Sequence, residues 1–217
     1  MEKEAQTILQ FIEFSNKLKS QLRTIKLSKD RHESVADHSW QLALMILLVY
    51  PHLKTKPNLL RSLKMALIHD ITEAEIGDTP HGTALRYPAA KAEKDRLEKL
   101  EIEKVKKMVG GDLGQEIFDI WNEYESRDTF ESKLVKALDT LEANLQSTFF
   151  DVSYWDNYYY KVALEKSGKH CIHEEILVKL DNAINERLET KYLEAGFDLE
   201  KIKSGFYDNE EIGTNKL

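Results

Sequence analysis

Apolar residues recur at helical spacing along most of the chain. Between residues 4 and 22 they fall three and four positions apart, which places them on one side of a helix. The members of this apolar side are Ile8, Phe11, Ile12, Phe14 and Leu18. Residues 24–33 are polar and are expected to connect the first two helices. The same periodicity predicts further helices over residues 35–50, 58–76, 89–109, 113–125, 129–150 and 171–195.

Local signals mark where some of these helices begin and end. Ser34 and Asp37 form the S-x-x-D pattern of a capping box ahead of the apolar run over residues 40–50. Pro51 predicts the end of that helix, because proline cannot continue the helical hydrogen bonding. Gly77 lies where the helix predicted over 58–76 should stop.

No repeat, low-complexity tract or linker divides the chain. We therefore expect one all-α domain, a bundle of seven or eight helices over residues 1–195. Beyond Gly196 the sequence turns polar and loses its periodicity, so residues 196–217 are expected to form a C-terminal appendage or flexible tail.

Composition supports a helical fold. Nine glycines and four prolines in 217 residues are about half the usual combined share of roughly 12%. This scarcity argues against turn-rich all-β folds and against disorder rich in proline and glycine. Residues 77–88 are the exception within the body of the chain, and long loops in compact domains are often functional. Four of the thirteen residues lie there, namely Gly77, Pro80, Gly82 and Pro88.

Charge and cysteine content narrow the possible partners. The net charge of −7 disfavours nucleic-acid polymers and anionic membranes as partners. The apolar run over residues 42–50 is far shorter than the ~20 residues that span a bilayer. Cys171 is the single cysteine and cannot form an internal disulfide, and the first residues, MEKEAQ, do not resemble a secretory signal. A cytoplasmic protein is expected.

Polar residues within apolar helical surroundings are the candidates for chemistry. Burying such side chains is costly unless they are paired or bind a metal ion. Imidazoles and carboxylates suit divalent ions such as Mn²⁺, Fe²⁺, Co²⁺, Ni²⁺ and Zn²⁺, and helical bundles build metal sites from several helices. Each residue alone also fits a structural role, and spacing by itself leaves both interpretations open. The four candidates are His38, His69, Asp70 and Asp139.

Glu73 extends this set along the helix predicted over residues 58–76. It lies four residues after His69 and three after Asp70, so the three side chains should project from one helix face. A carboxylate near a metal ion, but not needed as a ligand, could orient or deprotonate a water molecule.

Three segments in this order carry a family resemblance: RHESVADHSW at 31–40, IHDITEAEIGDTP at 68–80 and LVKALDTLEANLQ at 134–146. They resemble the motif blocks of the HD-domain metal-dependent phosphohydrolases, and are most similar to the bacterial 5'-deoxynucleotidase-like branch. The resemblance implies an HD-domain helical bundle with one divalent metal ion, which could be Mn, Co, Fe, Ni, Zn or Mg. It also implies that the metal ligands are the same four residues, His38, His69, Asp70 and Asp139.

The resemblance further implies roles for three other residues. Glu73 matches a catalytic position near the metal-activated water, and Asp78 matches a second acid that could protonate the leaving 5' oxygen. Arg23 matches a phosphate-binding arginine, a task that suits a bidentate guanidinium. Thr24 stands where the deoxynucleotidases have a tryptophan that helps to read sugar and base, so selectivity for deoxyribose stays open.

The expected activity is therefore hydrolysis of a phosphate ester, with a nucleoside 5'-monophosphate as the favoured substrate. Two alternatives stay open. The chain could hydrolyse another phosphate ester, such as a dNTP or cyclic nucleotide. It could also be a non-catalytic, metal-containing protein with a nucleotide-binding or regulatory role. The retention of Glu73 and Asp78 favours an enzyme, because binding alone would not require them. We expect a homodimer with no nucleic-acid polymer and no membrane as partner.

Several other features receive structural interpretations. His81 and Arg86 could contact phosphate but are more simply solvated loop residues. The Tyr-rich residues 154–160 could form a dimer surface or pack between helices. Residues 91–107 are interpreted as a solvated helix face, and the adjacent His170, Cys171 and His173 as incidental neighbours rather than a metal site.

Overall fold

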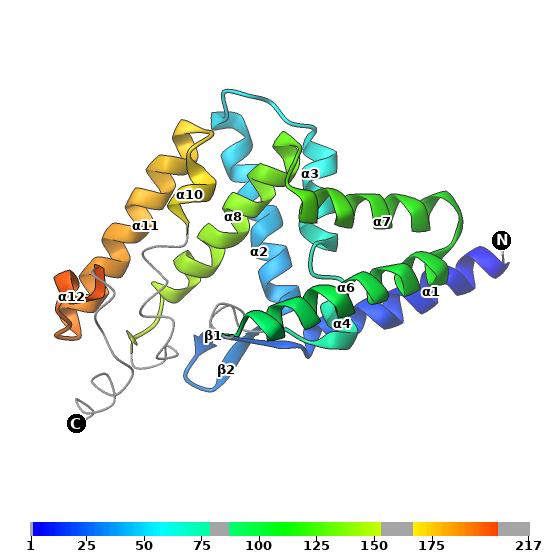
Figure 1. The fold of residues 1–217 in the computed structure, drawn as a ribbon, viewed down its shortest axis with the longest axis horizontal. Coiled ribbons are helices and arrows are strands. Elements are labelled where there is room, and N and C mark those ends of the chain that lie inside the picture. The colour runs from blue at the N-terminus through cyan, green and yellow to red at the C-terminus, as the bar shows by residue number, and fades with distance from the viewer. Residues whose placement is uncertain (1, 79–86, 153–166, 204–217) are drawn as a thin grey trace.

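The computed structural model describes residues 2–78, 87–152 and 167–203. Helices account for most of these residues, which confirms the predicted all-α class (Figure 1). A two-stranded hairpin is the only sheet in the described ranges. The elements in chain order are α1 Glu2–Asn16, the 3-10 turn η1 Lys17–Lys19, β1 Leu22–Ser28, β2 Arg31–Ser34, α2 Val35–Val49, the 3-10 turn η2 Tyr50–His52, α3 Leu59–Ile68, α4 Glu73–Ile76, α6 Pro88–Val109, α7 Gly111–Ser126, α8 Phe130–Ser147, α10 Gly168–Cys171, α11 Glu175–Glu194 and α12 Leu199–Lys203.

The hairpin corrects the prediction of a helix through residue 22 followed by a connector. Helix α1 ends at Asn16, and strands β1 and β2 pair antiparallel, with Leu22 opposite Ser34. The strand sequence alternates between exposed and less exposed positions and includes the β-branched Thr24 and Ile25, which favour extended backbone. The hairpin packs against α8. Arg23 therefore lies on a strand, not at a helix end.

The predicted capping box at the start of α2 is confirmed. The Ser34 hydroxyl accepts a hydrogen bond from the Asp37 backbone N–H at 3.1 Å, and the Asp37 carboxylate accepts one from the Ser34 backbone N–H at 2.9 Å. These bonds satisfy donors that the first turn of a helix leaves open. They also fix the phase of α2, so that His38 in the first turn faces the protein interior.

The helix predicted over residues 58–76 is interrupted. Helix α3 ends at Ile68, and α4 begins at Glu73 and ends before Gly77, which has the positive φ of +76° expected of a stop. Between them the backbone makes tighter bonds, from Ile71 N–H to Ile68 C=O and from Glu73 N–H to Asp70 C=O. Glu73 is therefore on a different helix from Ile68, and the His-Asp pair lies in the intervening turn.

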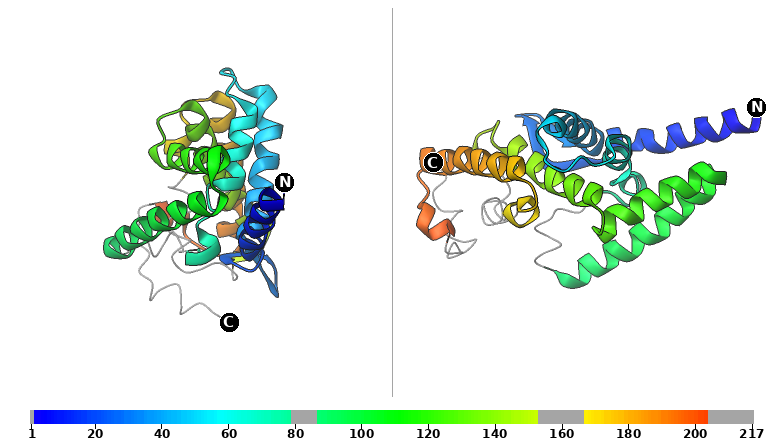
Figure 2. Two further views of the ribbon diagram at one scale, coloured as in Figure 1. Left: turned by 90° about the vertical axis from the view of Figure 1, so that its right-hand side faces the viewer. Right: turned by 90° about the horizontal axis from the view of Figure 1, so that it is seen from above.

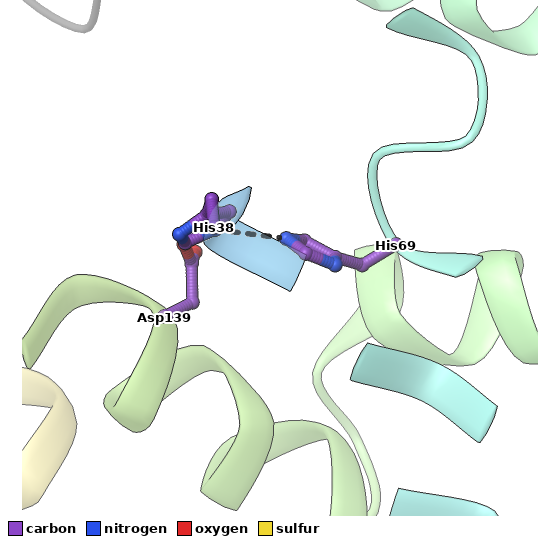
Figure 3. Close-up of side chains that lie close together, drawn as sticks. All are labelled: His38, His69 and Asp139. Carbon is purple, nitrogen blue, oxygen red and sulfur yellow. Dashed lines mark hydrogen bonds and ion pairs between the residues drawn. The ribbon is translucent and has the colours of Figure 1, made fainter. Parts of the chain in front are cut away.

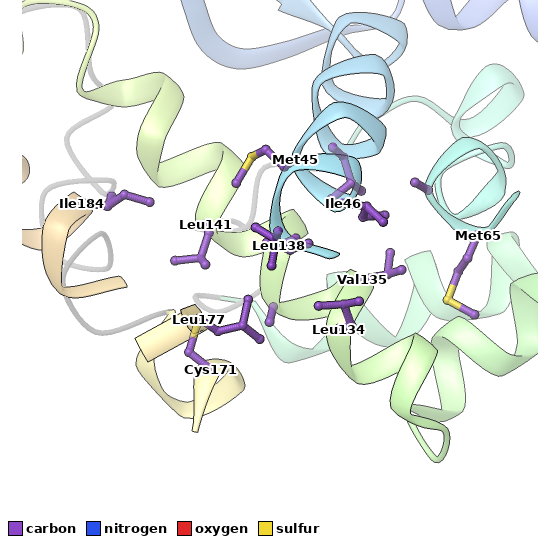
Figure 4. Packing of buried hydrophobic residues seen from close by; sticks show 14 of the residues in the cluster. Met45, Ile46, Met65, Leu134, Val135, Leu138, Leu141, Cys171, Leu177 and Ile184 are labelled. Carbon is purple, nitrogen blue, oxygen red and sulfur yellow. The ribbon is translucent and has the colours of Figure 1, made fainter. Parts of the chain in front are cut away.

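Two apolar clusters form the core. The larger one joins α2, α3, α8 and α11 through side chains such as Ile46, Met65 and Leu138 (Figure 4). The smaller one joins α1, α6 and α7. Figure 1 shows α8 and α11 toward the left and α1, α6 and α7 toward the right, with α2 between them.

The two clusters meet at the candidate site. In α2, His38 lies between Val35, which belongs to the smaller cluster, and Leu42, which belongs to the larger one. His69 similarly lies between Ala66 of the larger cluster and Ile71 of the smaller one. Two separately packed groups of helices therefore hold the site at their junction, which fixes its backbone from both sides.

The ends of the described chain differ from the periodic pattern. In α1 only the last part of the predicted apolar side is buried, since Ile8 and Ile12 are each 59% exposed. The view from above in Figure 2 shows the start of α1 projecting beyond the other helices. Helix α12 lies in the predicted appendage, yet its Ile202 packs into the larger core cluster.

Some predictions lie outside the described residues. These concern His81 and Arg86 in the turn-rich segment, the Tyr-rich residues 154–160 and the remainder of the tail from residue 204. Among the described residues, no helix combines the length and the apolar character needed to cross a bilayer.

Candidate active site

Two buried imidazoles face each other at the centre of the site. His38 comes from the first turn of α2, and His69 follows the last residue of α3. Their Nε2 atoms are 3.3 Å apart, and the rings meet edge to face with centroids 5.3 Å apart (Figure 3). Because the two residues are 31 positions apart in the sequence, their close approach is a product of the tertiary fold.

The outer nitrogens of both rings have acceptors. His38 Nδ1 is 2.5 Å from a carboxylate oxygen of Glu142, and His69 Nδ1 is 2.9 Å from the Ala66 carbonyl oxygen. These acceptors assign a proton to each Nδ1 and direct each Nε2 toward the same point. In neutral rings, two Nε2 lone pairs would then face each other at 3.3 Å, an arrangement that a shared cation relieves.

Asp139 of α8 adds a carboxylate to this point. Its Oδ1 lies 3.1 Å from His38 Nε2, while its Oδ2 accepts hydrogen bonds from Tyr124 and Lys136, each at 2.7 Å. These two donors fix the carboxylate with Oδ1 toward the imidazoles (Figure 3). Burial opposes ionisation of Asp139, but Lys136 and the histidines hold its pKa well below the usual value.

Asp70 completes the set of four. Its Oδ2 lies 3.0 Å from His69 Nε2 and 3.8 Å from His38 Nε2. Although burial acts in the opposite direction, the two histidines hold the pKa of Asp70 well below its usual value. The structure thus brings together all four residues that the sequence singled out as ligands.

The donor set fits a divalent metal ion. Two imidazole nitrogens and two carboxylates converge, and atoms of His38, His69 and Asp139 lie within 4.8 Å of one another. Hard-to-borderline ions accept this combination, and both rings have the outer hydrogen bond that is usual for metal-binding histidines. Without metal, burial and Arg23 lower the pKa of His38, but the carboxylates of Glu142 and Asp139 outweigh them and raise it to about 10.

Glu73 lies beside this set but is held by a different partner. Its side chain is buried, and its Oε1 accepts a hydrogen bond from Lys94 Nζ at 2.9 Å. Burial and the charge of Asp70 raise its pKa to about 9, with Lys94 acting in the opposite direction. A carboxylate with a raised pKa is a stronger proton acceptor than an exposed one.

Lys94 shows that the interpretation of residues 91–107 as a solvated face holds for one side of α6 only. Lys91 and Asp95 form an exposed ion pair on that side. Lys94 instead reaches Glu73 and, at 3.3 Å, Glu98. Farther along α6, residues such as Val105 are buried in the smaller cluster. One side of α6 therefore borders the candidate site and the core.

Asp78 is half-buried and lies two residues after the end of α4. Burial raises its pKa above the usual value, and the nearby charge of Asp70 adds to the shift. Arg23 and Lys94 act in the opposite direction, which shows that both cations are close enough to influence this carboxyl. A raised pKa leaves Asp78 better able to retain a proton that can be donated.

Arg23 reaches the site from β1 and is already paired. Its Nη1 lies 2.8 Å from Glu33 Oε2 and 3.4 Å from Glu142 Oε2, and the side chain is 14% exposed. Burial, together with Glu142, raises the pKa of Glu33 to about 7, and Arg23 acts in the opposite direction. The guanidinium is thus an internal cation held by two buried acids.

Sequence reasoning missed several functional candidates. Glu142 carries a detectable signal, because it lies three residues after Asp139 and so one helical turn away. Lys136 has the same spacing on the other side of Asp139. Lys94 and Tyr124 carry no such local signal, since their partners are distant in the sequence and the contacts depend on helix packing.

The fold and the site together define an all-helical protein with a buried metal-type cluster of histidines and aspartates, one pair of which is a His-Asp dipeptide at a helix end. The chain belongs to the HD-domain family: a family model described as "HD domain" matches residues 15–180.

Named relatives are similar in sequence over most of this region. A Xenopus laevis protein named 5'-deoxynucleotidase HDDC2 is 35% identical over 147 residues, which cover 67% of this chain and 70% of the relative. The Dictyostelium discoideum protein of the same name is 37% identical over 152 residues, covering 64% of this chain and 75% of the relative.

Solved structures resemble the fold. A protein from Magnetospirillum magnetotacticum, described as a predicted metal-dependent phosphohydrolase, superposes with a TM-score of 0.73 at 26% identity. The match covers 87% of this chain and 95% of that one. A conserved hypothetical protein from Pyrococcus furiosus gives a TM-score of 0.63 at 30% identity, with 83% and 99% covered.

Proposed function

We propose that the chain is a metal-dependent phosphomonoesterase that converts nucleoside 5'-monophosphates to nucleoside and phosphate. The observation that carries the proposal is the convergence of the two Nε2 atoms, 3.3 Å apart, with the carboxylates of Asp70 and Asp139. The relatives named 5'-deoxynucleotidases support a nucleotide as the substrate.

One divalent ion would be held by His38, His69, Asp70 and Asp139. When bound, such an ion polarises a phosphoryl oxygen and lowers the pKa of water, which supplies a nucleophile near neutral pH. The buried position of the imidazoles strengthens their interaction with a cation, because little solvent screens it.

Glu73 is the proton acceptor in the proposed reaction. Lys94 binds its Oε1, so Oε2 is the oxygen assigned to receive the proton of the attacking water. As water oxygen bonds to phosphorus, the bond from phosphorus to the 5' oxygen breaks. The ion pair with Lys94 keeps the Glu73 carboxylate in place, and a bound divalent ion would offset the charge of Asp70, so that Glu73 is ionised and can accept the proton.

Asp78 and Arg23 act on the other atoms of the substrate. Protonated Asp78 would donate its proton to the leaving 5' oxygen, so that the nucleoside departs as a neutral alcohol. Arg23 would bind the phosphate oxygens and offset the charge that the transferring phosphoryl group carries. Two buried carboxyls, Glu33 and Glu142, keep the guanidinium beside the site, where it can meet an anion.

We further propose that the chain forms a homodimer through the outer face of α2. Helix α2 is apolar on nearly all sides, as is typical of a helix covered on both sides. Its residues opposite the core are exposed, with Trp40 and Leu48 each at 64%. A second copy can present the same face in a twofold arrangement. Sedimentation analysis should show a dimer for the wild type and a monomer for Leu48→Lys, whereas a monomeric wild type contradicts the dimer.

Identification of the products formed from a substrate panel, with inorganic phosphate as the product expected from monophosphates, tests the activity. The panel contains ribonucleoside and deoxyribonucleoside 5'-monophosphates, a dNTP and a cyclic nucleotide, each with Mn²⁺, Co²⁺, Ni²⁺, Zn²⁺ or Mg²⁺. We expect the monophosphates to be hydrolysed and His69→Ala to be inactive, while His173→Ala, a histidine outside the site, stays active. Failure of every metal to support phosphate release from a monophosphate would refute the nucleotidase proposal.

A further inference from the structure

Helix α8 contacts both ring nitrogens of His38. Asp139 places its Oδ1 3.1 Å from Nε2, and Glu142, one helical turn later, places its Oε2 2.5 Å from Nδ1. The imidazole is fully buried, and so is the Glu142 side chain. One helix therefore sets the orientation of this ring from both sides.

The same oxygen of Glu142 also faces Arg23. Oε2 lies 3.4 Å from Arg23 Nη1, while Oε1 has no hydrogen-bond partner within the described part of the chain. Nη1 also binds Glu33 at 2.8 Å. A ring nitrogen of His38 and the guanidinium of Arg23 thus share a single carboxylate oxygen, in a region where burial makes charge interactions strong.

We propose that Glu142 is a positioning residue that orients His38 for the metal ion and holds Arg23 back from the phosphate. The inference rests on the proposed function, because it concerns the metal and phosphate sites assigned there. Through His38 Nδ1, the Glu142 carboxylate fixes the ring and makes Nε2 a better ligand. Through Arg23 Nη1, it competes with the phosphate oxygens for the same donor.

These two effects predict that Glu142→Gln changes the affinities for Mn²⁺ and for inorganic phosphate in opposite directions. The amide side chain keeps the size of glutamate but loses the charge. Mn²⁺ should bind about tenfold more weakly, within the range seen when an outer partner of a metal-binding histidine is removed. Inorganic phosphate should bind the Mn²⁺-saturated protein severalfold more tightly, because Arg23 has one acidic competitor fewer. A variant that merely disturbs the fold would bind both Mn²⁺ and phosphate more weakly.

Glu33→Gln is the matched control. It also changes a buried acid next to Arg23, but the acceptor on His38 Nδ1 is Glu142. We expect Glu33→Gln to tighten phosphate binding and to leave the affinity for Mn²⁺ within about twofold of the wild type. If both variants weaken Mn²⁺ binding equally, the effect is one of general charge and the positioning role of Glu142 is wrong.

The affinity for Mn²⁺ is measured by competition with a fluorescent chelator, and that for inorganic phosphate by calorimetry on the metal-saturated protein. In an Arg23→Gln background, Glu142→Gln should no longer tighten phosphate binding; continued tightening overturns the link to Arg23. An unchanged affinity for Mn²⁺ in Glu142→Gln overturns the link to His38.

A measurement on the wild type keeps the inference testable should Glu142→Gln not fold. In the Zn²⁺-loaded protein, the His38 Nδ1 proton should give an exchange-protected NMR signal shifted downfield by its carboxylate acceptor. A rapidly exchanging Nδ1 proton overturns the inference. A wild type that binds Zn²⁺ but hydrolyses no monophosphate refutes the proposed function alone, whereas one that binds neither Mn²⁺ nor Zn²⁺ overturns both.

Discussion

Two regions of the described chain place histidines next to potential metal-binding partners, and the two regions have opposite electrostatics. At the candidate site, carboxylates surround His38 and raise its pKa to about 10. In α10, burial and then the charges of Lys136, Lys169 and Arg127 lower the pKa of His170 to about 4. Lys136 takes part in both regions, since it pairs with Asp139 and repels a proton on His170.

The difference shows that residue type does not define a metal site. His170, Cys171 and His173 are near neighbours in the sequence, yet Cys171 is buried in the apolar core and the ring of His173 packs edge-on against Phe130. The metal-type clusters among the described residues involve His38 and not this segment. The carboxylates of Asp70, Asp139 and Glu142 distinguish the first region, because they favour a cation where α10 disfavours one.

Removal of a ligand should have the largest effect and tests the comparison directly. Asp139→Ala should lose the bound ion and lower kcat/KM by about 10³-fold or more, because a carboxylate that faces both imidazoles is gone. Asp181→Ala, which changes a buried aspartate near Cys171, should keep both the bound ion and the wild-type kcat/KM. Metal analysis after dialysis and phosphate release measure the two properties. Undiminished metal occupancy in Asp139→Ala would remove Asp139 from the ligand set.

The second prediction separates metal binding from catalysis within the site. Glu73→Gln should retain the metal ion and lower kcat by about 10²- to 10⁴-fold, as expected when a general base is lost. Glu101→Gln, a change at a buried acid of α6 paired with Lys104, serves as the control and should keep its activity. Metal content and kcat are measured on the same preparation. A Glu73→Gln enzyme as fast as the wild type contradicts the role of Glu73.

The third prediction is that the two histidines give the metal-free protein opposite pH dependences. The pKa of folded His38 is raised from 6.5 to about 10, so its contribution to stability is complete below pH 6.5 and is lost as the pH rises toward 10. The pKa of folded His170 is lowered to about 4, so its contribution is complete above pH 6.5 and is lost as the pH falls toward 4.

Denaturant unfolding of the metal-free protein from pH 4.5 to 9 checks this prediction. Each group can change the free energy of unfolding by at most about 1.4 kcal/mol per pH unit. The metal-free His170→Gln variant should lose less stability than the wild type between pH 6.5 and 4.5, and His38→Gln should lose less between pH 7 and 9. Equal slopes for wild type and variants would show that the two regions do not differ as described.

The smallest expected effect concerns Cys171. The residue is 1% exposed, and burial followed by the charge of Asp181 raises the pKa of its thiol to about 12. We expect slow alkylation by iodoacetamide at pH 8 in the folded protein, and no change in that rate when Mn²⁺ is added. Cys171→Ala should keep turnover within about twofold of the wild type. Protection of the thiol by Mn²⁺ would indicate that this segment does sense the metal.

The sequence was most informative where signals are local. The capping box of Ser34 and Asp37 and the stop at Gly77 are correct in the structure, because their bonds or backbone angles involve neighbouring residues. The helix predicted over 58–76 is wrong at residues 69–72, since periodicity cannot distinguish a continuous helix from two helices joined by a tight turn. The hairpin was missed because its alternation is short and many of its residues are charged.

At the candidate site, too, the local motifs could be predicted and the long-range contacts could not. The motif blocks include His38, His69, Asp70 and Asp139, and the structure brings these four residues together. The pairing of Lys94 with Glu73 and of Arg23 with Glu142 could not be predicted, because each joins elements that are distant along the chain.

The position of the imidazoles at the junction of the two core clusters has a consequence for folding. An ion bound there would tie α2, the end of α3 and α8 into closed loops, as a covalent cross-link does in proteins with several cysteines. The chain has only one cysteine, and it is buried in the core. A link through a metal ion would be reversible. Removal of the ion by a chelator should therefore make the protein easier to digest with protease, and resupply of the ion should restore its resistance.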